Sequence, residues 1–407
     1  MIVILHEKSS EVLAEQIAEN LLNAFHDNIE VCLISAEAKT EWPGSVAWDD
    51  LLILLYGGSS YPESGNEFIH HFIAARHTSA RMLPVSTDIG SRRPPKDAAG
   101  IKALPYDVAD SDSRSHLVRR AGAMLGLRLQ GRDSKIFVSY RAVDGTAIAK
   151  QLHSHLTSLG YPAFLDEARE LDGDTRILPG TPVQSQIDEA LSDANLVLLI
   201  DTPAAPQSPW VRHEVETADA LLLPILPLCF RESGDKKQGP RFRSLLALQR
   251  WVQFLLPDEG SDPLEAAALD HVVNEVEMYL CEIYRRKCRV PFIVEQEFVS
   301  HGYDWKPLDK KLLLFESSKT HNLRLQMKVR SHCSLFDQIY SPAIKRFGEY
   351  LDQSGRGNFS LFIYDGELLA GPQIEDVVRE HSNDVIILHH QELAALIDSG
   401  FTKLGTP

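Results

Sequence analysis

Short apolar runs alternate with segments of helical periodicity between residues 135 and 230, and this alternation restricts the fold more than any other feature. The apolar runs are KIFVSY (135–140), YPAFLD (161–166), NLVLLID (195–201) and LPILPLCF (223–230). Strands that are apolar throughout and are separated by amphipathic helices form parallel sheets covered on both faces. The middle of the chain is therefore predicted to be an α/β unit with a parallel sheet.

Polar residues stand where these predicted strands end. Ligands of parallel sheets bind beyond the carboxyl ends of the strands, so these residues are the first candidates for a site. The loop after the third strand leads into a helix that begins near Trp210 and carries Glu214. Residues four apart lie on the same face of a helix. The pair is either an ordinary helix start or the wall of a pocket for a flat ligand.

The composition limits the classes of partner. The 407 residues carry a formal net charge of −16, which argues against nucleic acid and anionic membranes as partners. The five cysteines are scattered without metal-ligand spacing, so buried thiols in a reducing compartment and no metal site are expected. The first residues lack the pattern of a signal peptide, and the longest apolar run, 220–230, is too short to span a bilayer. A cytoplasmic protein is expected.

The middle block resembles a Toll/interleukin-1 receptor (TIR) domain over about residues 134–258. The resemblance rests on motifs in the correct order: IFVSYR, GYPAFLDE, IDEAL, ANLVLLIDTP and SPWVRHE. It is similar to the bacterial enzymatic members, which cleave NAD between nicotinamide and ribose, some of them cyclising the product. The resemblance implies a flavodoxin-like fold, NAD as substrate without a further cofactor, self-association through TIR domains, and a role in bacterial antiphage defence.

The same resemblance implies roles for individual residues. Glu214 would be the catalytic glutamate. The 167–182 loop would move during assembly. The implied substrate-binding residues are Ser139, Tyr140, Arg141, Phe164, Asp166, Ser208 and Trp210, with Tyr140 and Arg141 at the mouth of the pocket and Phe164 and Asp166 along its floor and side.

The chemistry of such a site is consistent without the resemblance. Breaking an N-glycosidic bond passes through an oxocarbenium-like state, which one carboxylate near the ribose stabilises as positive charge grows. Nicotinamide leaves as a neutral molecule, so no general acid is needed. The alternative is a non-catalytic TIR scaffold that signals through TIR–TIR contacts, with Glu214 only structural. The presence together of Tyr140-Arg141, Asp166, Ser208 and Glu214 favours the enzyme.

Two flanking domains are expected. Residues 1–130 repeat the strand–helix pattern but lack the tryptophan and the Ser-Tyr-Arg strand end, so a degenerate TIR-like interaction domain is predicted. Residues 263–407 begin with a long helical pattern and continue with apolar runs, which predicts a C-terminal α/β sensing or interaction domain. A protein or nucleotide activator would act through these flanks.

Overall fold

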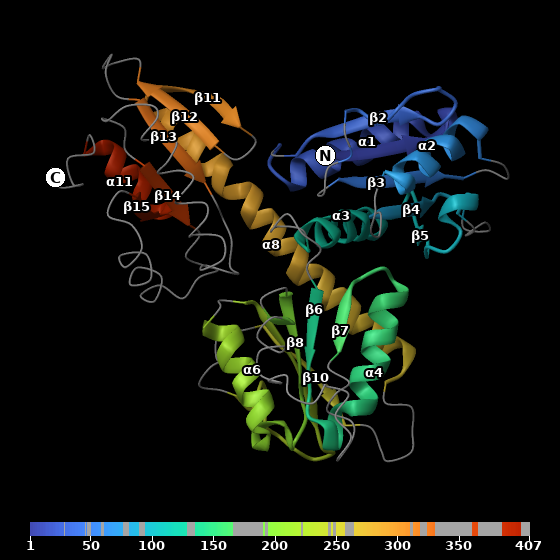
Figure 1. The fold of residues 1–407 in the computed structure, drawn as a ribbon, viewed down its shortest axis with the longest axis vertical. Helices are drawn as coiled ribbons and strands as arrows, with labels where there is room; N and C mark the ends of the chain where they lie inside the picture. Colours follow the sequence, from blue (N-terminus) through green and yellow to red (C-terminus); the bar gives the residue numbers. More distant parts are fainter. Residues whose placement is uncertain are drawn as a thin grey trace, which may run out of the picture. The chain divides into compact units, whose positions relative to one another are not determined.

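The computed structural model describes most of the chain as two compact units, Met1–Tyr284 and Arg285–Pro407, and each is described here by itself. The described residues are 1–27, 29–44, 46, 50–57, 61–75, 81–88, 94–127, 135–165, 190–191, 194–220, 223–242, 246, 250–256, 264–309, 312–317, 324–329, 360–364 and 385–399. They contain three five-stranded sheets, two in the first unit and one in the second (Figure 1). The α/β class is confirmed.

The first sheet is parallel and has the order β2-β1-β3-β4-β5. Its strands are β1 (Ile2–His6), β2 (Val31–Ser35), β3 (Leu51–Tyr56), β4 (Met82–Ser86) and β5 (Leu104–Pro105). The helices are α1 (Glu11–Ala24), α2 (Glu63–Ala74) and α3 (Ser111–Gly126). The chain leaves β1 and β3 in opposite directions, and right-handed crossovers therefore place α1 and α2 on opposite faces.

The second sheet is also parallel and has the order β10-β9-β8-β6-β7. Its strands are β6 (Lys135–Ser139), β7 (Ala163–Leu165), β8 (Ala194–Asp201), β9 (Ile225–Arg231) and β10 (Val252–Leu255). The helix α4 (Ala142–Ser158) covers one face, and α6 (Pro209–Ala220) covers the other. Successive residues of each strand therefore enter two separate cores.

Helix α8 (Ala266–Ser300) is 35 residues long and belongs to both units. The sequence pattern places the beginning of this helix in a C-terminal domain that starts at residue 263. Instead, Val272, Val276 and Leu280 pack in the core of the second sheet together with α4. The unit boundary lies within the helix, after Tyr284. An amphipathic stripe shows that a helix has a core to pack against, but it does not show which core.

Helices α3 and α8 approach each other closely at two glycines. A Cβ on Gly122 would lie 2.5 Å from Sγ of Cys281, and a Cβ on Gly126 would lie 2.5 Å from the carbonyl oxygen of Leu280. Only glycine permits such an approach of a helix to a neighbouring backbone. The contact ties the last helix of the first sheet to the helix that covers the second.

The sheet of the second unit is mixed, with the order β11-β12-β13-β14-β15. Its strands are β11 (Tyr303–Asp309), β12 (Leu312–Ser317), β13 (Arg324–Val329), β14 (Ser360–Tyr364) and β15 (Val385–His389). The first three strands are antiparallel and the last two extend the sheet in parallel. The short helix α11 (Leu393–Asp398) follows. Residues 334–351 and 373–382, which have helical sequence patterns, lie outside the described residues.

Candidate functional site

Ser139 and Glu214 form the centre of the candidate site. Ser139 is the last residue of β6, and Glu214 lies in the second turn of α6. The hydroxyl of Ser139 donates a hydrogen bond of 2.6 Å to Oε2 of Glu214. Neither residue exposes any of its surface. A carboxylate held in this way is preorganised, because a hydrogen bond inside a protein restricts its rotamer and replaces lost solvation.

The alternation of residues along β6 explains why Ser139 meets Glu214 and Tyr140 does not. Phe137 packs in the core beneath α6, and Ser139, two residues later, points to the same face. Tyr140 belongs to the opposite core, where its side chain packs with α4 and is fully buried. The structure therefore places Tyr140 inside the core and not at the mouth of a pocket.

Arg141 connects the end of β6 to the segment between β8 and α6. Its guanidinium donates hydrogen bonds to the carbonyl oxygen of Ala204 and, at 3.2 Å, to Oε1 of Gln207. A carboxylate oxygen of Asp144 accepts a hydrogen bond of 2.9 Å from the backbone N–H of Ala204. The first turn of α4 thus fixes the loop that leads into the helix of Glu214.

Ser208 and Trp210 stand at the beginning of α6. The hydroxyl of Ser208 accepts a hydrogen bond of 3.3 Å from the backbone N–H of Val211. Ser208 is therefore the N-cap residue of α6. Trp210 exposes 45% of its surface, whereas Glu214, one turn later, exposes none. The first turn of α6 therefore lies at the surface, where Trp210 is exposed, and the second turn, which carries Glu214, is buried.

Phe164 lies in β7 on the same face of the sheet as Ser139. Its ring is stacked on Phe137, with centroids 5.6 Å apart, and Nζ of Lys135 lies 5.7 Å from the ring centroid. Phe164 packs partly buried against the core beneath α6. Asp166 and the 167–182 loop lie outside the described residues. Their implied roles stay predictions.

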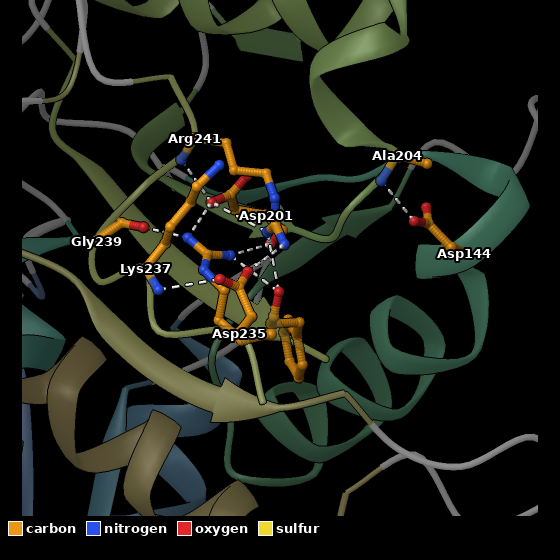
Figure 2. Close-up of polar contacts among 9 residues, drawn as sticks. Asp144, Asp201, Ala204, Asp235, Lys237, Gly239 and Arg241 are labelled. Carbon is orange, nitrogen blue, oxygen red and sulfur yellow. Dashed lines mark hydrogen bonds and ion pairs between the residues drawn. The ribbon is translucent and has the colours of Figure 1, made fainter. Parts of the chain in front are cut away.

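A second polar cluster lies at the same edge of the sheet, at the ends of β8 and β9. Oδ2 of Asp201 accepts hydrogen bonds from Nη2 of Arg231 at 3.2 Å and from the backbone N–H of Arg241 at 2.8 Å. Arg231 also donates to the carbonyl oxygen of Gly239. Figure 2 shows Asp201 facing the segment that carries Asp235, Gly239 and Arg241.

Burial controls the electrostatics of this cluster. Burial raises the pKa of Asp201 above its ordinary value, although the backbone N–H of Arg241 and the charge of Arg231 oppose the shift. Burial lowers the pKa of Arg241, and the neighbouring Arg231 adds to that effect. Burial also raises the pKa of the Cys229 thiol to about 12, which makes it a poor nucleophile. The cluster fixes the loop after β9 and holds no reactive thiol.

Sequence reasoning missed Asp201, Arg231 and Asp144. A signal for the first two was present, because each is a charged residue that directly ends a buried apolar strand. Asp144 binds a loop 60 residues away, and no local sequence pattern indicates such a contact. Among the described residues, no group of three or more His, Cys, Asp and Glu side chains could hold a metal ion.

Comparison with known families identifies this region. The family model described as "TIR domain" matches residues 136–267. The chain contains a TIR domain. Its match extends past β10 to the first residues of α8, and it includes Ser139, Arg141, Trp210 and Glu214.

The other comparisons add little to the TIR assignment. No curated protein matches the chain. One similar solved structure is tagatose-6-phosphate ketose/aldose isomerase from Escherichia coli, at 13% identity and a TM-score of 0.19, covering 69% of this chain and 81% of that one. A TM-score of 0.19 does not indicate a shared fold. In the described part of the chain, no helix has both the length and the apolar character required to cross a bilayer.

Proposed function

We propose that this protein is an NAD-consuming TIR effector that cleaves the bond between nicotinamide and ribose, with Glu214 as the catalytic residue. The observation that carries the proposal is the buried hydrogen bond between Ser139 and Glu214 at the carboxyl edge of the TIR sheet. Substrates of parallel α/β sheets bind at this edge. NAD is the proposed substrate, and no further cofactor is proposed.

The chemistry requires one carboxylate close to the ribose. As the bond to nicotinamide breaks, positive charge develops on the sugar, and a carboxylate stabilises that charge more than it stabilises the bound substrate. Ser139 fixes Oε2 of Glu214, and the carboxylate held in this way is proposed to bind the ribose hydroxyls. Trp210, exposed one turn earlier, offers a flat surface for the departing ring.

Water attacks the sugar carbon that nicotinamide has left and loses a proton to give ADP-ribose. Attack on the same carbon by an adenine nitrogen of the same molecule, in place of water, gives the cyclic product. We propose that the site is completed when copies of the TIR domain associate. Glu214 exposes no surface in the isolated chain, so a substrate reaches it only after a rearrangement. We propose that the effector acts in bacterial antiphage defence, in the cytoplasm. A protein or nucleotide activator would release it from this inactive state.

One experiment tests the assignment. Concentrated protein is incubated with NAD, and released nicotinamide is measured by chromatography. Glu214→Gln keeps the volume and the hydrogen bond to Ser139 but removes the charge, and turnover is expected to fall by about a hundredfold or more. Glu216→Gln on the exposed side of the same helix is the matched control and keeps full turnover. Equal turnover in both variants would remove Glu214 from the mechanism.

A second candidate function is a non-catalytic scaffold that signals through TIR–TIR contacts. The full burial of Glu214 favours this function. A buried carboxylate that accepts a hydrogen bond from Ser139, at the end of β6, also stabilises the packing of α6 on the sheet. If the protein is a scaffold, no nicotinamide is released at any protein concentration. It also predicts that Glu214→Gln weakens self-association or stability, which sedimentation and thermal unfolding measure.

A further inference from the structure

Glu277 joins three segments of the first unit inside a buried cluster. It lies in α8, and its side chain exposes no surface. Oε1 accepts hydrogen bonds from Nη1 of Arg120, in α3, and from the hydroxyl of Tyr161 at 3.0 Å. The guanidinium of Arg120 also lies 4.5 Å above the ring of Tyr161. We call Glu277, Arg120 and Tyr161 the Glu277 cluster.

The charge of Glu277 is maintained in spite of its burial. Burial alone would raise its pKa, but hydrogen bonding from His116 and the charge of Arg120 hold the pKa below its ordinary value. His116 Nε2 lies 3.5 Å from Oε2 of Glu277, and Nε of Arg119 lies 3.9 Å from it. All three partners come from α3, and Arg120 and Glu277 are both buried, so a buried ion pair joins α3 to α8.

The turn after α4 is held by the same cluster and by a second arginine. Nη2 of Arg120 donates a hydrogen bond of 2.6 Å to the carbonyl oxygen of Leu159, and Nη1 of Arg81 donates one of 2.9 Å to that of Gly160. These are carbonyls at the negative end of a helix, where guanidinium groups bind favourably. Both arginines belong to the module of the first sheet, outside the TIR domain.

This turn lies at the opposite edge of the sheet from the candidate site and is connected to it through β7. β7 begins two residues after Tyr161, and its Phe164 is stacked on Phe137. Phe137 stands two residues before Ser139, which holds Glu214. Among the described strands, β7 lies at the edge of the sheet and pairs with β6 alone, so its position depends strongly on its ends.

We propose that the Glu277 cluster is a latch that holds the TIR domain in a resting state, in which β7 is fixed and Glu214 is covered. This inference rests on the proposed function. Release of the turn at 159–161 lets β7 move and opens the edge at which Glu214 lies. The module of the first sheet thereby acts as an inhibitory element, and α8 connects the latch to the second unit.

A cavity gives small molecules access to the latch. Its volume is about 700 Å³, and Arg120, His116, Leu159 and Glu277 contribute to its lining. Apolar residues of the segment at 99–105 form another wall. A side chain that borders a cavity can be replaced by a small molecule of the same chemistry after it has been truncated. This property makes the latch testable by chemical rescue.

The first test removes one hydrogen bond from the latch. Tyr161→Phe in the full chain deletes the donor to Glu277 and leaves Arg120 in place. Backbone hydrogen exchange at 161–165 is expected to rise by about tenfold, the factor that corresponds to loss of a hydrogen bond to a charged group. Exchange in β8 is expected to stay unchanged. NAD turnover at low protein concentration is expected to rise by a similar factor.

Glu275→Gln is the matched control. Glu275 lies on the same helix, is largely buried, and pairs with Arg250 at 2.7 Å instead of with α3. It removes a charge from α8 without affecting the turn at 159–161, so neither exchange at 161–165 nor turnover is expected to change. An equal response of the two variants would overturn the latch, because it would show a general loss of stability.

The second test is rescue of Arg120→Ala. Guanidinium chloride at about 10 mM, far below the molar concentrations that unfold proteins, is expected to restore slow exchange at 161–165 and low turnover. Urea at the same concentration is neutral and is expected to restore neither. Rescue by both compounds, or by neither, would contradict a latch based on the guanidinium–carboxylate pair.

The exchange measurement separates failure of the latch from failure of the proposed function. Loss of protection at 161–165 in Tyr161→Phe without nicotinamide release by any variant would support the latch and reject the NAD-cleaving assignment. Unchanged protection at 161–165 in Tyr161→Phe would reject the latch, whatever the turnover of the wild-type protein.

Discussion

The hydroxyl of Ser139 and a carboxylate oxygen of Glu214 lie 2.6 Å apart although 75 positions separate the two residues in the sequence. The end of β6 and the second turn of α6 meet at this hydrogen bond. Both side chains are completely buried, so the bond is made in surroundings where an unpaired partner is costly. Ser139 is therefore a positioning residue for Glu214.

Ser139→Ala is expected to lower NAD turnover by about tenfold, because one hydrogen bond to a charged group is lost. The effect should fall on kcat more than on KM, since Ser139 is fully buried and its hydroxyl is bonded to the acid. Ser139→Thr, which retains the hydroxyl, should recover most of the turnover. Steady-state kinetics of the three proteins checks this, and equal turnover in all three would contradict a positioning role.

Asp201→Asn should destabilise the first unit by about 3–5 kcal/mol, because it leaves the buried guanidinium of Arg231 without a charged partner. Asp235→Asn is the control: Asp235 is partly exposed and lies 3.9 Å from Arg241, so a loss below about 1 kcal/mol is expected. Urea unfolding of both variants measures the difference. Similar losses would show that Asp201 has no special structural role.

The pairing of His301 with its neighbours predicts a pH dependence in the second unit. The carbonyl of Glu297 and then Asp398, 3.0 Å from Nε2, raise the pKa of His301 above its ordinary value. A raised pKa means that the stabilisation is complete below about pH 6.5 and is lost as pH rises through the folded-state pKa. It amounts to at most about 0.5 kcal/mol, since the group is exposed.

Hydrogen exchange of α11, which carries Asp398, should consequently be slower at pH 6 than at pH 8.5 after correction for the intrinsic rate. His301→Gln should abolish the difference. A pH dependence that persists in His301→Gln would assign it to another group.

Turnover per molecule should rise with protein concentration. Glu214 is covered in the isolated chain, and association of TIR domains is proposed to complete the site. Turnover measured across a wide dilution series, together with mass photometry, tests the dependence. A constant turnover from a protein that remains monomeric throughout would exclude assembly as the switch.

The parallel sheets were predictable because their central strands are apolar throughout. Strands β1, β3 and β8 are buried at every position, and a strand buried on both sides requires a sheet that is covered on both faces. Helix α3 was not predicted. Its first half is polar, and its core-facing positions include Arg120 and two glycines, which carry no apolar periodicity.

The candidate site was predictable in part, for a reason that lies in strand geometry. Ser139 and Glu214 were both chosen from the sequence, and the structure brings them together. Tyr140 was chosen with them, but adjacent residues of a strand face opposite sides, so it could not share their position. The contacts of Arg120 and Glu277 could not be predicted, because they depend on how α3 and α8 pack.

The close approach of α3 and α8 at Gly122 and Gly126 has a consequence for how α8 responds to force. At Gly126 the bare backbone of α3 lies against the backbone carbonyl of Leu280, and at Gly122 it lies against the short side chain of Cys281. A small rotation of α8 would press its side chains into that backbone, and intermediate positions are therefore sterically costly. The contact between the two helices is therefore expected to break as a whole and not to slide gradually. A gradual pull on α8 would thus give no response up to a threshold and a complete one beyond it.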